Sequence, residues 1–431
     1  MTVDTTGFAT RAVHAARNQG AASSRATPIY LTAGFEFDDF DHAAGHFGTG
    51  AGFGYTRTGN PTVHAVERQL AALESGADAV LVASGQAAVV TALLTVAGAG
   101  DHIVSSTHIY EGSRGLFLDN LARLGIETTF VDDIGDVDAW RAAIRPNTRA
   151  LFAESIANAR NDILDIAAIG AVADSSAIPL IVDNTLATPF LVRPLEHGAA
   201  IVVHSASKFL AGHGSVLGGV IVDDGRFDPI RAGHNAPHLV LPGRGGVASV
   251  AARHGGRARI AYARESVAPR FGASPSPLNA FLIGQGAETL GLRVERQSRN
   301  ALAVARWLAA HDAVESVDYV GLETHPDHSL ATRYLHGGYG SIFTFTLRGG
   351  IEAARHFVES VSVFTHMTHI GDVRSLVLHP GTTSHAHRTD EERDILGVSP
   401  GTLRLSIGIE DVADLIADLA RVLEPVREAV A

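Results

Sequence analysis

The sequence contains no cysteine among its 431 residues. Disulfides, thiolate metal ligands and a cysteine nucleophile are therefore all excluded. Positive charge is also scarce, because 34 lysines and arginines stand against 46 aspartates and glutamates, which gives a formal net charge of −12. This balance argues against nucleic acid or an anionic membrane surface as the main partner.

Long uninterrupted apolar segments are missing as well. Residues 1–20 lack the apolar core of a secretory signal, so we expect a cytoplasmic protein. The most apolar stretch, residues 79–100, is interrupted by Ser84, Gly85 and Gln86. It therefore predicts a buried strand followed by a core helix, not a membrane span.

Short apolar strands alternate with helical patterns along the middle of the chain. Strands are predicted at residues 78–85, 101–106, 127–132, 149–155, 178–185, 199–205 and 218–224. The alternation predicts an α/β fold with a mostly parallel central sheet covered on both faces. We expect three parts, which are an N-terminal arm (1–62), an α/β domain (63–271) and a smaller C-terminal α+β domain (272–431). Residues 224–270 are predicted as a long excursion that leads to a helix.

Four predicted strands end in polar residues. These ends are Ser84–Gln86, Glu154 with Asn158, Asp183–Thr185 and Ser205–Lys208. Because ligands of open α/β sheets bind beyond the carboxyl ends of the strands, the four ends are expected to converge on one pocket. The Ser-Gly turn into a helix favours a phosphate at the helix N-terminus, although a simple strand-to-helix connection looks the same.

A lysine and a carboxylate at two of these ends suggest a specific chemistry. Lys208 beside a bound phosphate is suited to form a Schiff base with an aldehyde cofactor, and Asp183 to pair with a protonated ring nitrogen. Pyridoxal 5'-phosphate (PLP) requires both groups. The alternative is that Asp183 caps a turn and Lys208 extends from the sheet edge to solvent. A dehydrogenase-like protein is disfavoured because no G-x-G-x-x-G follows the first strand.

The remaining candidate site residues are two arginines and the histidines. Arg57, in YTRTGNPT, is suited to grip a phosphate, or else belongs to a surface turn. Arg404 has apolar neighbours and is expected to point inward toward a carboxylate of the protein or of a substrate. The 22 histidines show no metal-ligand spacing, so we expect turn and surface histidines instead of a metal site.

Five motifs together resemble the Cys/Met-metabolism PLP-dependent enzymes. They are YTRTGNPT, ASGQAA, VDNTLATPFL, HSASKFLAGHGSVLGG and LRLSIGIED, and the likeness extends from about residue 12 to residue 411. The family includes cystathionine γ-synthases, methionine γ-lyases and the homoserine-ester sulfhydrylases, and the chain is most similar to its O-acetylhomoserine sulfhydrylase branch. The resemblance implies the aspartate aminotransferase-like fold (fold type I) of PLP-dependent transferases.

The resemblance also implies roles for individual residues. Lys208 would be the Schiff-base lysine, Asp183 the partner of the ring nitrogen, and Tyr110 the ring that stacks on the cofactor. The phosphate would be held by Gly85, Gln86, Ser205 and Ser207, and by Tyr55 and Arg57 of a neighbouring subunit. The substrate would be held by Arg404, Ser375, Asn158 and Tyr55, with Asn158 also near the cofactor ring.

The implied activity is γ-replacement on an O-acylated L-homoserine, with O-acetyl-L-homoserine as the expected ester. Sulfide or a thiol would then give homocysteine or methionine. A γ-lyase, a cystathionine γ-synthase-type activity or another nucleophile are the alternatives. The expected assembly is a homotetramer built as a dimer of dimers, with only small-molecule partners besides its own copies.

Several positions depart from the family pattern, including the following three. Glu111 follows Tyr110 where a small residue is usual, Arg114 adds a second charge nearby, and His369 lies shortly before Ser375. Glu111 and Arg114 either pair with each other or contribute to selectivity.

Overall fold

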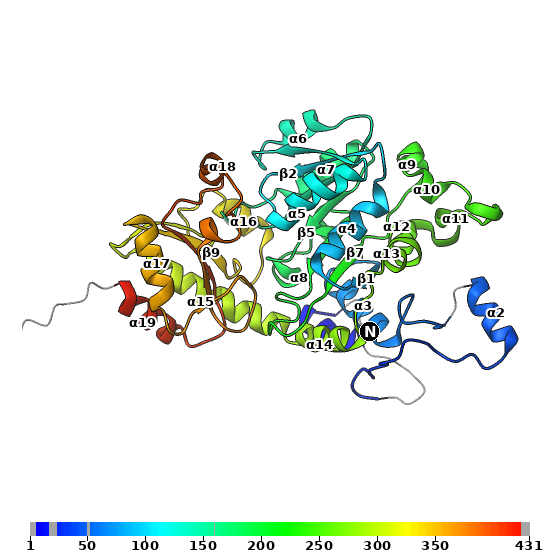
Figure 1. Cartoon of the computed structure of the whole chain (residues 1–431), viewed down its shortest axis with the longest axis horizontal. Coiled ribbons are helices and arrows are strands. Elements are labelled where there is room, and N and C mark those ends of the chain that lie inside the picture. The colour runs from blue at the N-terminus through cyan, green and yellow to red at the C-terminus, as the bar shows by residue number, and fades with distance from the viewer. Residues whose placement is uncertain (1–5, 17–23, 50–51, 159, 424–431) are drawn as a thin grey trace, which may run out of the picture.

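The computed structural model describes residues 6–16, 24–49, 52–158 and 160–423. Two units, each built around a β-sheet, lie side by side along the long axis of the molecule (Figure 1). Within the described residues, no helix has both the length and the apolar character needed to cross a membrane.

The larger unit contains a seven-stranded sheet in the order β1-β7-β6-β5-β4-β2-β3. The strands from β2 to β6 are parallel, and β7 runs antiparallel to both of its neighbours, β1 and β6. The predicted mostly parallel sheet is thus confirmed. The strands are β1 (Asp78–Val82), β2 (His102–Ser106), β3 (Glu127–Val131), β4 (Thr148–Glu154), β5 (Leu180–Asp183), β6 (Ile201–Ser205) and β7 (Gly219–Asp223).

Both faces of this sheet are buried, which explains why its strands are continuous apolar runs. Val182 and Val202 pack on one face with α3 and α7, whereas Ile181 and Val203 pack on the other with α4. Helices of this part are α3 (Pro61–Leu73), α4 (Gly85–Val96), α5 (Glu111–Gly115), α6 (Val137–Ala143), α7 (Ile166–Ser175) and α8 (Thr188–Leu191), with the π-helical segment η2 (Leu116–Leu121) continuing α5.

The excursion after β7 folds into short helices that flank the sheet (Figure 1). They are α9 (Pro229–Ala232), α10 (Pro237–Val240), α11 (Val250–His254), α12 (Ala258–Tyr262) and α13 (Ala268–Phe271). One helix was expected after this excursion. The structure has two helices there, α14 (Pro277–Glu288) and α15 (Leu290–Ala309), which meet at Thr289. Helix α15 belongs to both units, because Val294 lies in the core of the larger one and Val304 in the core of the smaller one.

The smaller unit carries a five-stranded sheet in the order β10-β11-β12-β9-β8. Its strands are β8 (Val314–Asp318), β9 (Ile342–Leu347), β10 (Thr365–His366), β11 (Leu376–Leu378) and β12 (Thr402–Ser406). Its helices are α16 (His328–Tyr334), α17 (Gly350–Ser360), α18 (Asp390–Ile395) and α19 (Val412–Leu423). The expected domain boundary at 271/272 stays a prediction.

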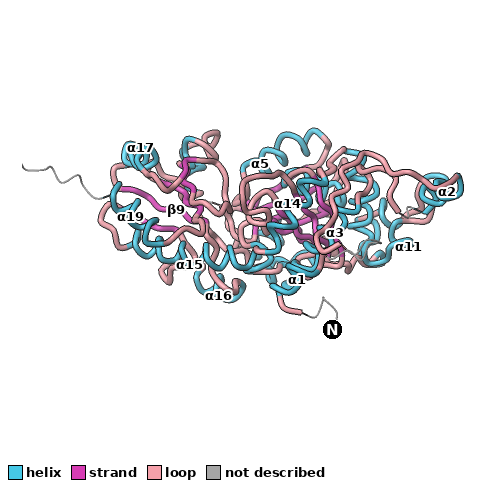
Figure 2. Tube along the Cα trace, turned by 90° about the horizontal axis from the view of Figure 1, so that it is seen from below, coloured by secondary structure: helices cyan, strands magenta, loops and turns pink. Residues whose placement is uncertain are grey.

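Within its described residues, the predicted arm includes the helices α1 (Phe8–His14) and α2 (Phe40–Thr49). Helix α1 packs on α3 and α14, where Gln69 donates to the carbonyl oxygen of Ala12 at 2.6 Å. Helix α2 instead stands away from the body of the chain (Figures 1 and 2). Residues 1–5, 17–23 and 50–51 of the arm lie outside the described residues.

Candidate active site

The four polar strand ends meet at one cavity of about 580 Å³. It opens at the carboxyl ends of the parallel strands, where the topology of an open sheet leaves room for a ligand. Residues of the smaller unit, including His369 and Arg404, form the opposite wall. The predicted site residues in its lining are Gly85, Gln86, Tyr110, Asn158, Asp183, Ser205, Ser207, Lys208 and Arg404.

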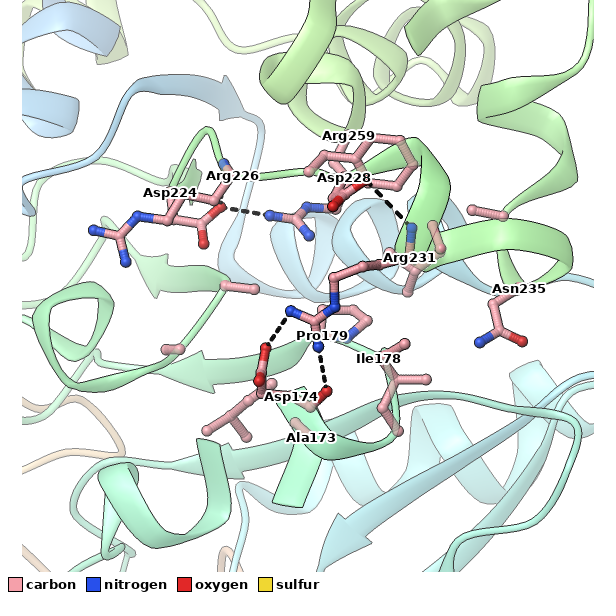
Figure 3. A pocket seen from close by; sticks show the side chains of 18 of the residues that line it. Ala173, Asp174, Ile178, Pro179, Asp224, Arg226, Asp228, Arg231, Asn235 and Arg259 are labelled. Carbon is pink, nitrogen blue, oxygen red and sulfur yellow. Dashed lines mark hydrogen bonds and ion pairs between the residues drawn. The ribbon is translucent and has the colours of Figure 1, made fainter. Parts of the chain in front are cut away.

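A second cavity, of about 420 Å³, lies at the other end of the sheet, beside the starts of β5 and β6 (Figure 3). Arginines in its lining already have carboxylate partners. Arg231 lies 2.9 Å from Asp174, and Arg259 donates to Asp224 at 2.5 Å. None of the predicted site residues lines this cavity.

The N-terminus of α4 forms one side of the first cavity. Ser84 is the N-cap, and its hydroxyl accepts from the Ala87 amide at 3.1 Å. The amides of the first helical turn have no intrahelical partner, so those of Gly85 and Gln86 are available to an anion. A Cβ atom at Gly85 would lie 2.7 Å from that of Ser205, so only glycine lets α4 approach β6 this closely.

Two serines stand opposite the start of α4. Ser205 ends β6, and its hydroxyl has no hydrogen-bond partner in the part of the chain that the structure describes. The hydroxyl of Ser207 exchanges hydrogen bonds with the backbone of Gly218, donating at 3.2 Å and accepting at 3.0 Å. Ser205 is therefore the freer of the two donors for a phosphate.

Lys208 follows β6 in a tight turn that is anchored by α15. The buried guanidinium of Arg293 donates to the carbonyl oxygen of Phe209 at 2.8 Å and to that of Gly286 at 2.6 Å. Burial lowers the pKa of Lys208 from 10.5 to about 8, with the charge of Arg404 acting in the same direction. A lysine with a lowered pKa is a better base and nucleophile near neutral pH.

Two carboxylates lie next to each other on the cavity side of the sheet, since Glu154 and Asp183 are paired in the register of β4 and β5. Burial raises the pKa of both groups, and for Glu154 the neighbouring Asp183 adds to the effect. Asp183 accepts from the amide and hydroxyl of Thr185 at 3.0 and 2.5 Å, whereas one oxygen of Glu154 is buried without a partner. The donors favour the anion at Asp183. At Glu154, burial and the nearby Asp183 favour a neutral acid, against the opposing effect of the Tyr110 amide, which donates to it at 2.6 Å.

A buried cation faces these acids from β12. Arg404 is 5% exposed, and its one hydrogen bond within the described residues runs to Asn158 at a long 3.4 Å. Buried arginines usually pair with a carboxylate, and Arg404 has none within salt-bridge distance in the same part of the chain. This cation is thus available to a carboxylate from outside the protein.

Three predicted site residues do not line the cavity. Ser375 is fully buried, where its hydroxyl donates to Glu410 at 2.9 Å and accepts from the Gly408 amide at 2.9 Å. Tyr55 and Arg57 lie on the arm, and Arg57 donates to the carbonyl oxygen of Pro269 at 3.0 Å. A single chain therefore does not bring these two residues to its own cavity.

Of the two alternatives for Glu111 and Arg114, the one in which they pair with each other is wrong. Glu111 accepts from Arg388 at 2.8 Å, and Arg114 donates to Glu392 at 3.0 Å. Both bridges therefore join α5 of the larger unit to the α18 region of the smaller one, at the cavity wall that contains Glu111. Sequence spacing shows only that two opposite charges are near each other, and it does not reveal partners almost 300 residues away.

The cavity also contains two residues, Glu154 and His369, to which no role could be assigned from the sequence. Glu154 was visible as a strand end, but its pairing with Asp183 depends on the register of two strands. His369 reaches from the smaller unit to place its Nδ1 atom 3.1 Å from Nζ of Lys208. Burial, with the charge of Lys208, lowers the pKa of His369 to about 4, so its ring is neutral. No motif around His369 predicts this contact.

These features fit PLP. The cofactor needs an amine, an acid for its ring nitrogen and a cradle for its phosphate. Lys208, Asp183 and the α4 N-terminus with Ser205 provide them within one cavity. The close approach at Gly85 supports the same assignment, because it brings the helix amides and the serine hydroxyl together. Tyr110, which is 51% exposed, supplies an aromatic face at the cavity.

The lowered pKa of Lys208 predicts how PLP uptake depends on pH. Only the neutral amine attacks an aldehyde, so the rate of covalent PLP capture by cofactor-free protein should rise with pH and level off above about 8. The measurement is the growth of the visible absorbance band across a pH series. Arg404→Leu should move the plateau to higher pH, because it removes one cause of the shift. A rate that still climbs steeply at pH 10 would contradict this account of Lys208.

Comparisons with known proteins agree with the site. The family model for Cys/Met metabolism PLP-dependent enzymes matches residues 9–424. The O-acetyl-L-homoserine sulfhydrylase of Corynebacterium glutamicum is 42% identical over 96% of both chains. The homocysteine synthase of Schizosaccharomyces pombe is also 42% identical, over 98% of this chain and all of its own.

A solved structure is similar over the whole fold. It comes from Campylobacter jejuni, is assigned as an O-acetylhomoserine (thiol)-lyase and contains a pyridoxyl-lysine phosphate residue. Its TM-score is 0.93 at 34% identity, covering 97% of this chain and all of that one. Since the family model, the curated relatives and the fold coincide over nearly the whole length, the chain belongs to the Cys/Met metabolism PLP-dependent enzymes.

Proposed function

We propose that this enzyme catalyses γ-replacement on O-acetyl-L-homoserine, with sulfide or a thiol as the nucleophile and homocysteine or methionine as the product. The observation that carries the proposal is that a base, a carboxylate and a buried cation surround one cavity, namely Lys208, Asp183 and Arg404, and that the cation has no carboxylate partner among the described residues. The names of the relatives support the same reaction. We place the reaction in the cytoplasm.

The chain's own residues supply binding and proton transfer. Arg404, assisted by Asn158, binds the α-carboxylate of the substrate, which places the Cα–H bond near Lys208. When bound, PLP supplies an electron-withdrawing ring that makes the protons on Cα and Cβ acidic. The ionised Asp183 favours a protonated ring nitrogen and so strengthens that effect.

Lys208 then acts as the proton carrier. It takes the proton from Cα, passes it to solvent, and as a free amine again takes the second proton from Cβ. The Cγ–O bond breaks, and acetate departs with the electron pair. The sulfide anion forms a Cγ–S bond in its place, and the two protons return to Cβ and Cα. Acetate needs no proton to leave, so Lys208 can suffice as the acid and base at carbon.

A substrate matrix tests the proposal. O-acetyl-, O-succinyl- and O-phospho-L-homoserine are each assayed with sulfide, methanethiol and cysteine, and without any thiol. We expect the acetyl ester with sulfide or methanethiol to give the highest kcat/KM. Keto acid released at a similar rate without thiol would favour a γ-lyase, and a preference for cysteine would favour a cystathionine γ-synthase.

We further propose that two chains build each site. The arm exposes large apolar side chains, with Phe40 86% and Phe47 82% exposed, and such surface is usually covered in an assembly. Tyr55, on the same arm, is 49% exposed, and the Arg57 guanidinium lies 5.5 Å from the centre of its ring. In this proposal the two residues hold the phosphate in the neighbouring subunit, and two such dimers form a tetramer.

Mixed dimers test the shared site. Chains with Lys208→Ala and chains with Arg57→Ala should each be nearly inactive at limiting PLP. When the two chains are coexpressed, the mixed dimer contains one site with both native residues. Random pairing should restore about a quarter of the wild-type activity. Activity no higher than the sum of the separate variants would show that Arg57 serves its own chain.

A further inference from the structure

One ion pair separates a buried arginine from the active-site cavity. Glu111, the first residue of α5, lines the cavity, and its side chain is 22% exposed. Arg388, just before α18, is not among the lining residues, and its side chain is 3% exposed. Nε of Arg388 donates to Oε1 of Glu111 at 2.8 Å, and Nη2 of Arg388 lies 2.7 Å from the same oxygen. Glu111 thus stands between this guanidinium and the cavity.

Two further charges complete a network around this pair. Arg114 donates to Oε1 of Glu392 at 3.0 Å, and the same oxygen lies 3.7 Å from Nη1 of Arg388. The capping box of α18 holds Glu392 in place, because its other oxygen accepts from the Thr389 amide at 3.0 Å. We call Glu111, Arg388, Glu392 and Arg114 the bridge network. Its two positive and two negative charges balance, and only Glu111 lines the cavity.

The other charges at the cavity leave little for a second anionic group of a substrate. The lining contains two cations, Lys208 and Arg404, and three carboxylates, Glu111, Glu154 and Asp183. In the proposed function both cations already have a task, since Lys208 binds PLP and carries protons while Arg404 binds the α-carboxylate. No lysine or arginine of the lining is left over.

The remaining basic groups do not fill this gap. Two histidines, His369 and His385, line the cavity, but burial lowers the pKa of each, which favours their neutral rings. In the proposed dimer the neighbouring subunit's Arg57 holds the cofactor phosphate. The cation that lies directly behind the cavity wall is Arg388, and Glu111 occupies it.

The candidate esters differ in the charge of the group attached to the γ-oxygen. The acetyl group is neutral, whereas the succinyl group ends in a carboxylate and the phospho group is itself an anion. An anion that enters this cavity meets the carboxylate of Glu111 and no free cation. Like charges brought together in this way disfavour the wrong partner more than they favour the right one.

We propose that Glu111 is a specificity-determining residue, which by pairing with Arg388 at the cavity wall selects homoserine esters with a neutral acyl group. The inference rests on the proposed function, because it takes Arg404 as the site of the α-carboxylate. It gives a physical reason for a preference for the acetyl ester over the succinyl and phospho esters.

The test compares esters in the holoenzyme. The kcat/KM of O-acetyl-L-homoserine with sulfide is divided by that of O-succinyl-L-homoserine, and we call this quotient the ester ratio. Glu111→Gln removes the charge but keeps the size of the side chain and an oxygen that can accept from Arg388. The ester ratio should fall about tenfold, mainly through a lower KM for the succinyl ester, and O-phospho-L-homoserine should gain likewise.

Two further variants make the test specific. Glu392→Gln is the matched control, because it removes the same charge from the bridge network at a residue that does not line the cavity. Glutamine can also serve in the capping box, so the ester ratio should stay within about twofold of the wild-type value. Combining Glu111→Gln with Arg388→Met should abolish the gain for the charged esters, because the released cation is then missing. Circular dichroism at the assay temperature establishes that each variant is folded.

The outcomes separate this inference from the proposed function. An unchanged ester ratio in Glu111→Gln would overturn the inference and leave the proposed reaction intact. An equal fall in Glu392→Gln would also overturn it, because the position at the cavity wall would then be irrelevant. A gain that persists in the double variant would overturn the part assigned to Arg388. Wild-type protein that turns over none of the homoserine esters would instead refute the proposed function.

Discussion

Replacing Lys208 with alanine should stop exchange of the substrate's α-proton while PLP remains bound. A positioned general base contributes about 10²- to 10⁴-fold, and the cavity offers few alternatives. His369, the group in contact with Lys208, has its pKa lowered to about 4 and is a weak base. PLP should remain because, in the proposed site, the amides of α4, Ser205 and Asp183 would hold it independently of the lysine.

The measurement is deuterium incorporation at Cα of L-methionine in D2O, followed by NMR, with bound PLP quantified by absorbance. Added ethylamine should restore part of the exchange in Lys208→Ala, because a small amine can occupy the place of the lost side chain. Exchange that persists in the variant without added amine would show that another residue is the base.

Replacing Arg404 with methionine should weaken substrate binding and leave the fold intact. Truncating one partner of a buried, hydrogen-bonded charge pair costs about 2–5 kcal/mol, which corresponds to a rise in KM of about 30-fold or more. The folded chain, by contrast, is relieved of a buried charge whose one hydrogen bond among the described residues is the long contact with Asn158. Replacing such a charge by an apolar side chain is often neutral or stabilising, by about 1–4 kcal/mol.

For Arg404→Met we therefore expect steady-state kinetics to show weaker substrate binding. Thermal unfolding should show an unchanged or higher unfolding temperature. Asn158→Ala is a useful companion, because it removes the neighbouring amide without touching the charge and should raise KM less. A variant that unfolds at lower temperature but keeps its KM would identify Arg404 as a structural residue of β12.

Much of the fold could be predicted from sequence because the central strands are short, apolar and separated by helices. For this reason the strands that contain Val182 and Val202 could be predicted, as could the polar residues at their ends. The helices within residues 224–270 could not be predicted, because they are short, contain many glycines and arginines and show little periodicity. The break between α14 and α15 at Thr289 has no strong stop signal either.

The site was predictable where function depends on residues close together in sequence. Lys208, Ser205 and Ser207 lie in one segment, and Gly85 follows a strand, so their convergence follows from the topology of a parallel sheet. Contacts between the two units were not predictable. The bridges of Glu111 to Arg388 and of Lys208 to His369 depend on how α15 sets one sheet against the other.

The anchoring of the Lys208 turn by Arg293 has a mechanical consequence. Arg293 belongs to α15, the helix whose far end lies in the core of the smaller unit, and it holds the carbonyl of Phe209 directly. Gly371 adds a second link, because its backbone packs so closely on Phe209 that a Cβ atom there would lie 2.7 Å from the ring. A displacement of the smaller unit against the larger one would therefore reach the Lys208 turn through these two contacts.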